Sequence, residues 1–334
     1  MNCIYFKNTK SPPSINNPDV HLTLPSGYAY ETATHFVHFY GLNHGLHIIS
    51  TNMTSTELKN DLTLEQWVEK HFGAKEIESM NIKPGQSKEW VWRPTLFYYN
   101  EIEQAMRTDL VDRMNTEKVL RLLIEKLHDL LSYIEPDENG LKVYSHRIRE
   151  LLILACTEVE NFWQAYLKRN GISPINSRNY TTVDYVKLCN PLFLKEYEFE
   201  FRNYTHIPPI RPFSSWDAAS PTKSLPWFDA YNSTKHDRTS HFNKATLDNA
   251  IQAVIANLIM YSVKFSPLAI HHGLDNFGAL INLNMNYQLT RTDHKTYYLP
   301  LLKPIPYNEP GLMYTFKSHD NGLHELYDVS QIII

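Results

Sequence analysis

The chain has 334 residues, with 32 basic and 36 acidic side chains, so its net charge of −4 provides no overall attraction for nucleic acid. Its 11 glycines are dispersed, and the absence of G-x-G-x-x-G and G-x-x-x-x-G-K-[ST] excludes the Rossmann fingerprint and the P-loop. Three scattered cysteines argue against a disulfide framework. Because the sequence shows no apolar signal-type segment at 1–14 and no apolar run of about 18 residues, we expect a cytoplasmic protein that does not enter a membrane.

The first 112 residues are expected to form an α+β extension of unassigned role. Residue character alternates around 35–40 and 47–50, a pattern that is typical of short strands. Thr63 followed by the run 64–72 predicts a short capped helix. Residues 90–99 are predicted to form a strand at a sheet edge, because Pro94 lacks the amide proton that a central strand needs.

The middle of the chain has helical periodicity. Apolar spacing predicts helices at 99–114, 116–134 and 144–170, and Gly171 stands at the C′ position of the third. Residues 194–201 and 204–210 are a candidate hairpin. A further helix is predicted from 244 to about 263, with Asn243 as its N-cap. We therefore predict a mainly α protein, with a helical bundle at 113–290 and an extended tail at 291–334.

The segment 226–242 combines a predicted helix with the densest set of reactive side chains. Pro226 suits the first position of a helix, and Asp229, Asn232 and His236 would then share one face. Histidine exchanges protons near neutral pH, lysine and arginine bind phosphate, and asparagine orients ligand oxygens. The competing interpretation is a hydrogen-bonded junction between two helices, with the aromatic residues of the segment in the core.

The sequence Y-N-S-T-K-H at 231–236 resembles the motif of the HEPN superfamily (higher eukaryotes and prokaryotes nucleotide-binding). That motif is Arg, commonly Asn, three variable residues and His. Asn232 and His236 match it at the family spacing, whereas Tyr231 stands where the family has Arg. The resemblance covers about residues 113–265 and implies a helical bundle that pairs into a homodimer, with the two motifs facing across a basic cleft.

The resemblance also implies a function directed at RNA or a nucleotide, and many family members are metal-independent ribonucleases of toxin or defence systems. In such a mechanism His236 would be the acid or base, Asn232 would position a phosphate oxygen, and Arg238 or Lys235 would stabilise charge in place of the missing arginine. No metal and no cofactor are expected. The alternatives are a catalytically degenerate relative that only binds, and a non-enzymatic interaction or scaffold protein in which residues 231–238 are structural.

The long helix predicted at 144–170 adds two candidate substrate-binding residues to Lys235 and Tyr231. Arg147 and Glu158 share one face of this helix, about 16 Å apart along its axis. Glu158 stands among apolar residues, where an acid needs a partner. We hypothesise that it faces His236 or Arg238; the alternative is an exposed acid, or one paired with a lysine of its own helix.

Two other clusters have a functional and a structural interpretation. Four histidines are spaced as in some metal sites, although their aromatic neighbours favour a strand core. They are His35, His38, His44 and His47. The second cluster combines aromatic rings with a cation that could stack on RNA bases, but such rings are more often core residues (Trp90, Trp92, Arg93, Tyr98 and Tyr99).

Overall fold

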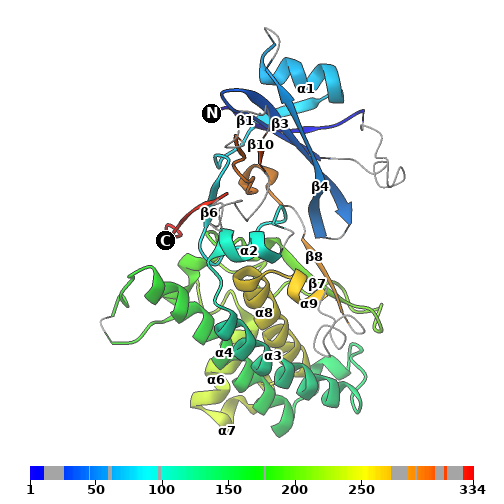
Figure 1. The fold of residues 1–334 in the computed structure, drawn as a ribbon. Helices are drawn as coiled ribbons and strands as arrows, with labels where there is room; N and C mark the ends of the chain where they lie inside the picture. The colour runs from blue at the N-terminus through cyan, green and yellow to red at the C-terminus, as the bar shows by residue number, and fades with distance from the viewer. Residues whose placement is uncertain are drawn as a thin grey trace. The chain divides into compact units, whose positions relative to one another are not determined.

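The structure is a computed structural model, and its described part consists of 1–10, 26–44, 46–58, 62–96, 99–176, 178–271, 285–289, 292–304, 312–313 and 326–334. The chain forms two compact units (Figure 1). The sheet unit contains Met1–Thr108 and Arg291–Ser330, and the helical unit contains Asp109–Thr290 and Gln331–Ile334. The tail that we expected to be separate from residue 291 onwards therefore belongs mostly to the sheet unit.

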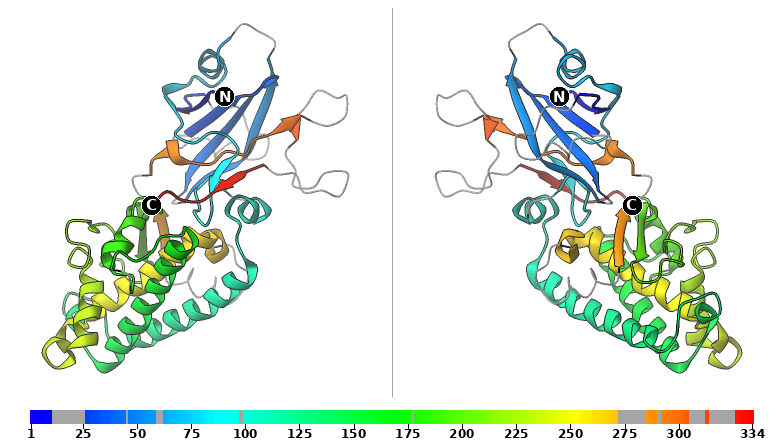
Figure 2. Two further views of the ribbon diagram at one scale, coloured as in Figure 1. Left: turned by 90° about the vertical axis from the view of Figure 1, so that its left-hand side faces the viewer. Right: turned by 90° about the vertical axis from the view of Figure 1, so that its right-hand side faces the viewer.

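The sheet unit is built on a five-stranded antiparallel sheet in the order β4-β3-β2-β1-β5, whose strands run side by side in Figure 2. The strands are β1 (Cys3–Lys7), β2 (Ser26–Glu31), β3 (His35–His44), β4 (Leu46–Glu57) and β5 (Lys75–Ser79). Strands β3 and β4 pair along their length, which confirms the strands predicted around 35–40 and 47–50.

Helix α1 (Leu64–Phe72) packs on this sheet and confirms the capped helix predicted there. The Thr63 hydroxyl accepts a hydrogen bond from the Gln66 amide, and the Gln66 side chain accepts one from the Thr63 amide. This capping box satisfies amides that the first turn leaves free. The buried core between helix and sheet contains Ile4, Phe6, Ala29, Phe36, Leu64, Trp67, Val68, Phe72 and Ala74.

Segments distant in sequence complete the sheet unit. Strand β6 (Gln86–Lys88) pairs in parallel with β11 (Asp328–Ser330), and β9 (Lys303–Pro304) pairs with β10 (Leu312–Met313). The strand predicted at 90–99 is wrong. Trp90 has a φ of 59°, and the Leu96 amide donates to the Arg93 carbonyl, so the backbone turns where a strand would have to extend.

The helical unit is dominated by α3 (Leu110–Leu131), α4 (His146–Arg169), α6 (Pro226–His236) and α8 (Leu247–Phe265). Figure 1 shows α3, α4 and α8 packed side by side, and α8 is buried along almost its whole length. Shorter elements are α5 (Thr182–Tyr185), α7 (Arg238–His241), α9 (Leu268–His271) and the 3-10 turns η2 (Gly140–Lys142), η3 (Val186–Leu188), η4 (Leu194–Glu196) and η5 (Phe242–Lys244).

The predicted helix ends agree with the structure at some positions and fail at others. Helix α4 ends before Gly171, whose φ of 67° confirms its role at C′. The helix predicted at 99–114 is instead divided into α2 (Tyr99–Met106) and α3, because Asp109 caps a new helix by accepting from the amides of Val111 and Asp112. Asn243 is not the N-cap of α8; Thr246 is, accepting from the Asn249 amide.

The candidate hairpin at 194–210 is partly present. Strand β7 (Tyr197–Phe201) has Met285–Leu289, strand β8, as its antiparallel partner, while Ile210 meets it only through a single bridge to Phe199. Because of its strands the protein is mixed α/β rather than mainly α. Within the described residues, no helix combines the length and apolarity needed to cross a lipid bilayer.

Candidate functional site on helix α6

Helix α6 forms where the sequence predicts it, from Pro226 to His236. Pro226 occupies the first turn, where its missing amide proton costs no hydrogen bond, and Asp229 places a negative charge near the positive helix N-terminus. One face is buried, and its Trp227 and Phe228 rings lie 6.3 Å and 5.2 Å from the Trp163 ring on α4. Trp227 and Phe228 are therefore core residues.

Hydrogen bonds join the buried face of α6 to α4. The Tyr231 hydroxyl donates to Glu160 Oε2 at 2.9 Å and accepts from Lys235 Nζ at 2.7 Å. The Arg149 guanidinium donates to the Thr234 carbonyl at 2.8 Å. Burial raises the pKa of Tyr231, and the hydrogen bond to its hydroxyl raises the pKa of Lys235. We call these five residues the α4–α6 seam.

The seam explains what Tyr231 does at the position of the family's arginine. Its side chain is fully buried, and its hydroxyl is occupied by Glu160 on one side and Lys235 on the other. A neutral phenol in that setting links two helices and carries no positive charge for a phosphate. Any charge stabilisation near α6 has to come from other residues.

The other end of α6 is open to solvent. His236 and Arg238 are exposed, and Asn232 is half-buried one helical turn before His236. Between them Asp237 ends α6 and caps α7 by accepting from the Ser240 amide at 3.0 Å, a hydrogen bond that lowers the pKa of Asp237. The chain therefore bends between the candidate acid–base histidine and the candidate arginine, and leaves both accessible.

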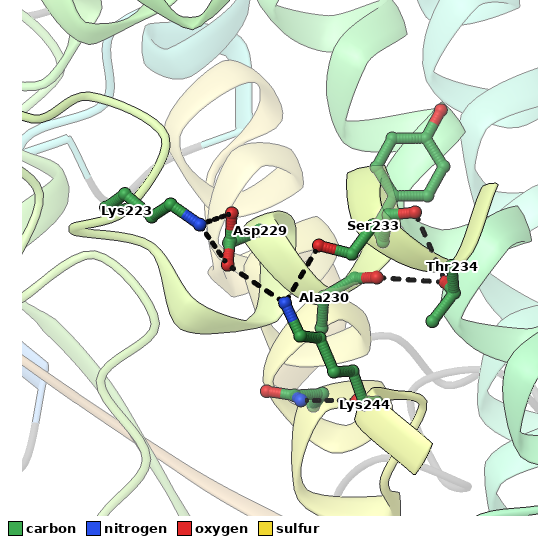
Figure 3. Close-up of polar contacts among 8 residues, drawn as sticks. Lys223, Asp229, Ala230, Ser233, Thr234 and Lys244 are labelled. Atoms are coloured by element: carbon green, nitrogen blue, oxygen red, sulfur yellow. Dashed lines mark hydrogen bonds and ion pairs between the residues drawn. The ribbon is translucent and has the colours of Figure 1, made fainter. Parts of the chain in front are cut away.

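A cluster of charges, which we call the polar face, gathers around Asp229 and Ser233 of α6 (Figure 3). Lys223 Nζ contacts both Asp229 carboxylate oxygens at 2.8 Å and 3.0 Å. Lys244 Nζ donates to the Ser233 hydroxyl at 3.1 Å and lies 3.9 Å from Asp229 Oδ2. Two lysines thus share one carboxylate, which leaves one positive charge in excess.

Sequence reasoning did not select Lys223 and Lys244. Both flank the candidate segment, Lys223 three residues before Pro226 and Lys244 two residues after Phe242. Their closeness to the segment was the available signal, but only the folded turn brings both ammonium groups onto Asp229.

The structure does not bring Glu158 or Arg147 to α6. Glu158 accepts a hydrogen bond from Asn161 on its own helix at 3.1 Å, and Arg147 lies 3.2 Å from Asp129 of α3. Glu160 bonds to α6, and a residue two positions away on a helix points about 200° around the axis. The hypothesis that Glu158 faces His236 or Arg238 is therefore wrong, and Glu160 makes the contact with α6, through Tyr231.

The histidine cluster at 35–47 is not assembled as a metal site in the described residues, where no group of three or more potential metal ligands occurs. His38 is fully buried and its ring stacks on Phe72 at 3.7 Å. Burial lowers the pKa of His38 to about 3, so this ring is neutral at pH 7. His35 is hydrogen-bonded to the Thr34 hydroxyl, and the side chains of His44 and His47 lie outside the described part.

The aromatic cluster around Trp92 is a core feature. Trp92 and Arg93 are fully buried, the Trp92 indole donates to the Leu96 carbonyl, and Arg93 donates to the Thr296 hydroxyl at 2.8 Å. Neither side chain is accessible to stack on RNA bases. Tyr98 and the side chain of Tyr99 lie outside the described part of the chain.

The chain matches no family model, no curated protein and no solved structure. The resemblance to the HEPN superfamily consequently depends on the spacing of Asn232 and His236 and on the helices around them.

Proposed function

We propose that the helical unit is a HEPN-like, RNA-directed domain and that His236 gives it metal-independent ribonuclease activity. The observation that supports this proposal is the division of the motif into two halves. Tyr231 and Thr234 are buried and hydrogen-bonded to α4, whereas His236 and Arg238 are exposed beside the half-buried Asn232. The accessible turn thus presents an acid–base group, a cation and an amide within seven residues, which is the set that the proposed reaction needs.

In the proposed reaction, His236 takes the proton of an RNA 2′-hydroxyl and the 2′-oxygen attacks the adjacent phosphorus. The bond from phosphorus to the 5′-oxygen breaks, and that oxygen takes a proton from the same group of a second copy in a homodimer. Arg238 and the excess charge of the polar face stabilise the negative charge that builds up on the phosphate oxygens. Asn232 positions one of those oxygens.

The test is cleavage of a labelled single-stranded RNA in the presence of EDTA. We expect the wild-type protein to cleave and His236→Ala to lose about 100-fold or more of the rate, as is typical when a general acid or base is removed. His128→Ala is the matched control, because His128 is an exposed histidine on a different helix, α3. Equal rates in wild type and His236→Ala, or no cleavage by either, would remove the ribonuclease proposal.

The second candidate function is a non-enzymatic interaction protein, which the α4–α6 seam favours because its hydrogen bonds give residues 231–235 a structural role. Fluorescence anisotropy with a labelled RNA separates the two. An RNA-directed domain binds more weakly as salt rises, and the double variant Lys223→Gln/Lys244→Gln reduces that salt dependence. An interaction protein shows no RNA binding in either form.

A further inference from the structure

A pocket of about 250 Å³ opens between α3, α4 and α8. Each helix contributes one face to it, with residues spaced by three, four and seven positions as on a single helix side. Its wall consists of Asp112, Asn115, Thr116, Val119 and Leu120 from α3, Glu158, Asn161, Phe162 and Ala165 from α4, and Asn257 and Lys264 from α8. None of these residues belongs to the polar face or to the α4–α6 seam.

Asn257 provides an unused hydrogen-bond acceptor in this wall. The residue is fully buried, and its Nδ2 donates to the carbonyls of Ala155 at 2.8 Å and Ala253 at 2.9 Å. These two bonds fix the orientation of the amide, because a flip would place Oδ1 against two carbonyl oxygens. Oδ1 has no hydrogen-bond donor among the described residues, and a buried acceptor without a donor costs free energy.

The charges of the wall leave one carboxylate without a cation. Lys264 is 5% exposed, and its Nζ lies 2.6 Å from Asp112 Oδ2, so these two charges neutralise each other. Glu158 is half-buried, and the contact recorded for its carboxylate within the described chain is with the neutral amide of Asn161. A carboxylate in such a site favours a cationic partner.

Val119, Leu120, Phe162 and Ala165 form the apolar part of the wall, beside the polar Asn115 and Thr116. Its volume lies just below the range of about 300–1,000 Å³ that is typical of pockets for drug-sized ligands. An anion would meet the acceptors Glu158 and Asn257, and is disfavoured. We propose that this pocket binds a small primary ammonium ion with a short apolar body, whose N–H donors bond to the Glu158 carboxylate. The proposal is independent of the RNA-directed function.

The first experiment is isothermal titration calorimetry of the full chain with 3-methylbutylamine and 2-phenylethylamine. The matched neutral and anionic probes are 3-methylbutanol and 3-methylbutanoate, which keep the apolar body and change the head group. We expect saturable binding of at least one amine and at least about tenfold weaker binding of the alcohol and the acid. Absence of amine binding at millimolar concentration, as for a pocket that holds only water, or equal binding of all head groups, would overturn the proposal.

Three variants then locate the bound amine. Glu158→Gln keeps the side-chain shape and removes the charge, and Ala165→Leu fills the pocket without changing a polar group. Both are expected to weaken amine binding by about tenfold or more, whereas Glu150→Gln, on an exposed acid of the same helix, leaves it unchanged. Circular dichroism confirms that each variant folds. Amine binding that survives both Glu158→Gln and Ala165→Leu would exclude this pocket as the site.

Discussion

The two units differ in the titratable groups that they bury. In the sheet unit, burial lowers the pKa of His38 to about 3 and that of His294 to about 4, and it raises the pKa of Tyr28, so these groups are neutral at pH 7. In the helical unit, the buried Lys264 is retained as an ion with a partner, because its Nζ lies 2.6 Å from Asp112 Oδ2. The sheet unit also buries Arg93, which donates to the Thr296 hydroxyl, so a buried charged group with a partner occurs in both units.

The largest expected effect concerns the aromatic core of the helical unit. Trp163→Ala removes the indole that packs against Trp216 at 4.9 Å and Phe228 at 5.2 Å. We expect the free energy of unfolding to fall by about 3–5 kcal/mol, as for other large aromatic residues cut to alanine in a core. Urea unfolding followed by far-ultraviolet circular dichroism measures it. Tyr133→Ala, at a side chain 79% exposed, is the control, and a loss below about 1 kcal/mol for Trp163→Ala would contradict the prediction.

The second prediction tests the neutral histidine of the sheet unit. The pKa of His38 is about 3 in the folded protein, against an ordinary value of 6.5, so the unfolded chain binds more protons between these values. Stability is therefore lost as pH falls below about 6.5, and His38 by itself accounts for about 2 kcal/mol of the loss at pH 5 relative to pH 8. Urea unfolding at the two pH values measures this difference.

His38→Phe supplies the comparison for that measurement, because it preserves an aromatic ring that can stack on Phe72 and removes the titrating group. The variant is expected to lose about 2 kcal/mol less than wild type between pH 8 and pH 5. The same substitution at the exposed His71 of α1 should leave the pH dependence of wild type intact. An identical pH dependence in wild type and His38→Phe would show that His38 is not held neutral.

The smallest expected effect concerns the α4–α6 seam. Tyr231→Phe keeps the buried ring and removes the hydroxyl that joins Glu160 to Lys235, so the free energy of unfolding should fall by about 1 kcal/mol. Tyr133→Phe, at the exposed tyrosine, should change it by less than about 0.5 kcal/mol. Retention of RNA cleavage in Tyr231→Phe would agree with a purely structural seam, whereas a large loss of cleavage without loss of stability would place Tyr231 at the reacting phosphate.

Local signals predicted those elements whose ends are determined by neighbouring residues. The Thr63 capping box, Gly171 at a left-handed C′ position and Pro226 in a first turn each act within a few residues, and the three helices concerned match the structure. The segment at 90–99 failed because its conformation depends on distant groups: Arg93 bonds Thr296, 203 positions further along the chain. At α8, Asn243 and Thr246 are both good capping residues, and sequence alone did not choose between them.

For the candidate site too, the sequence predicted what depends on neighbouring residues and missed what depends on the packing of distant helices. Helical spacing placed Asn232 and His236 on one face of α6, but the partner of Tyr231 lies 71 positions away on another helix. Periodicity alone cannot say which of Glu158 and Glu160 faces α6, because that depends on how the helices pack. The pocket was not predicted for the same reason: its spacings are present in the sequence, yet which three helices meet is a tertiary property.

The division of the sheet unit between the two ends of the chain determines the order in which the protein can be completed during synthesis. Strand β6 obtains its partner only when β11 has been made, and Tyr5 in the first strand stacks on the ring of His294 at 4.7 Å. The Tyr30 hydroxyl likewise donates to the carbonyl of Pro300. Strands β1 and β2 therefore lack these partners until segments some 270 positions further along the chain have been made, and until then they expose edges and aromatic rings.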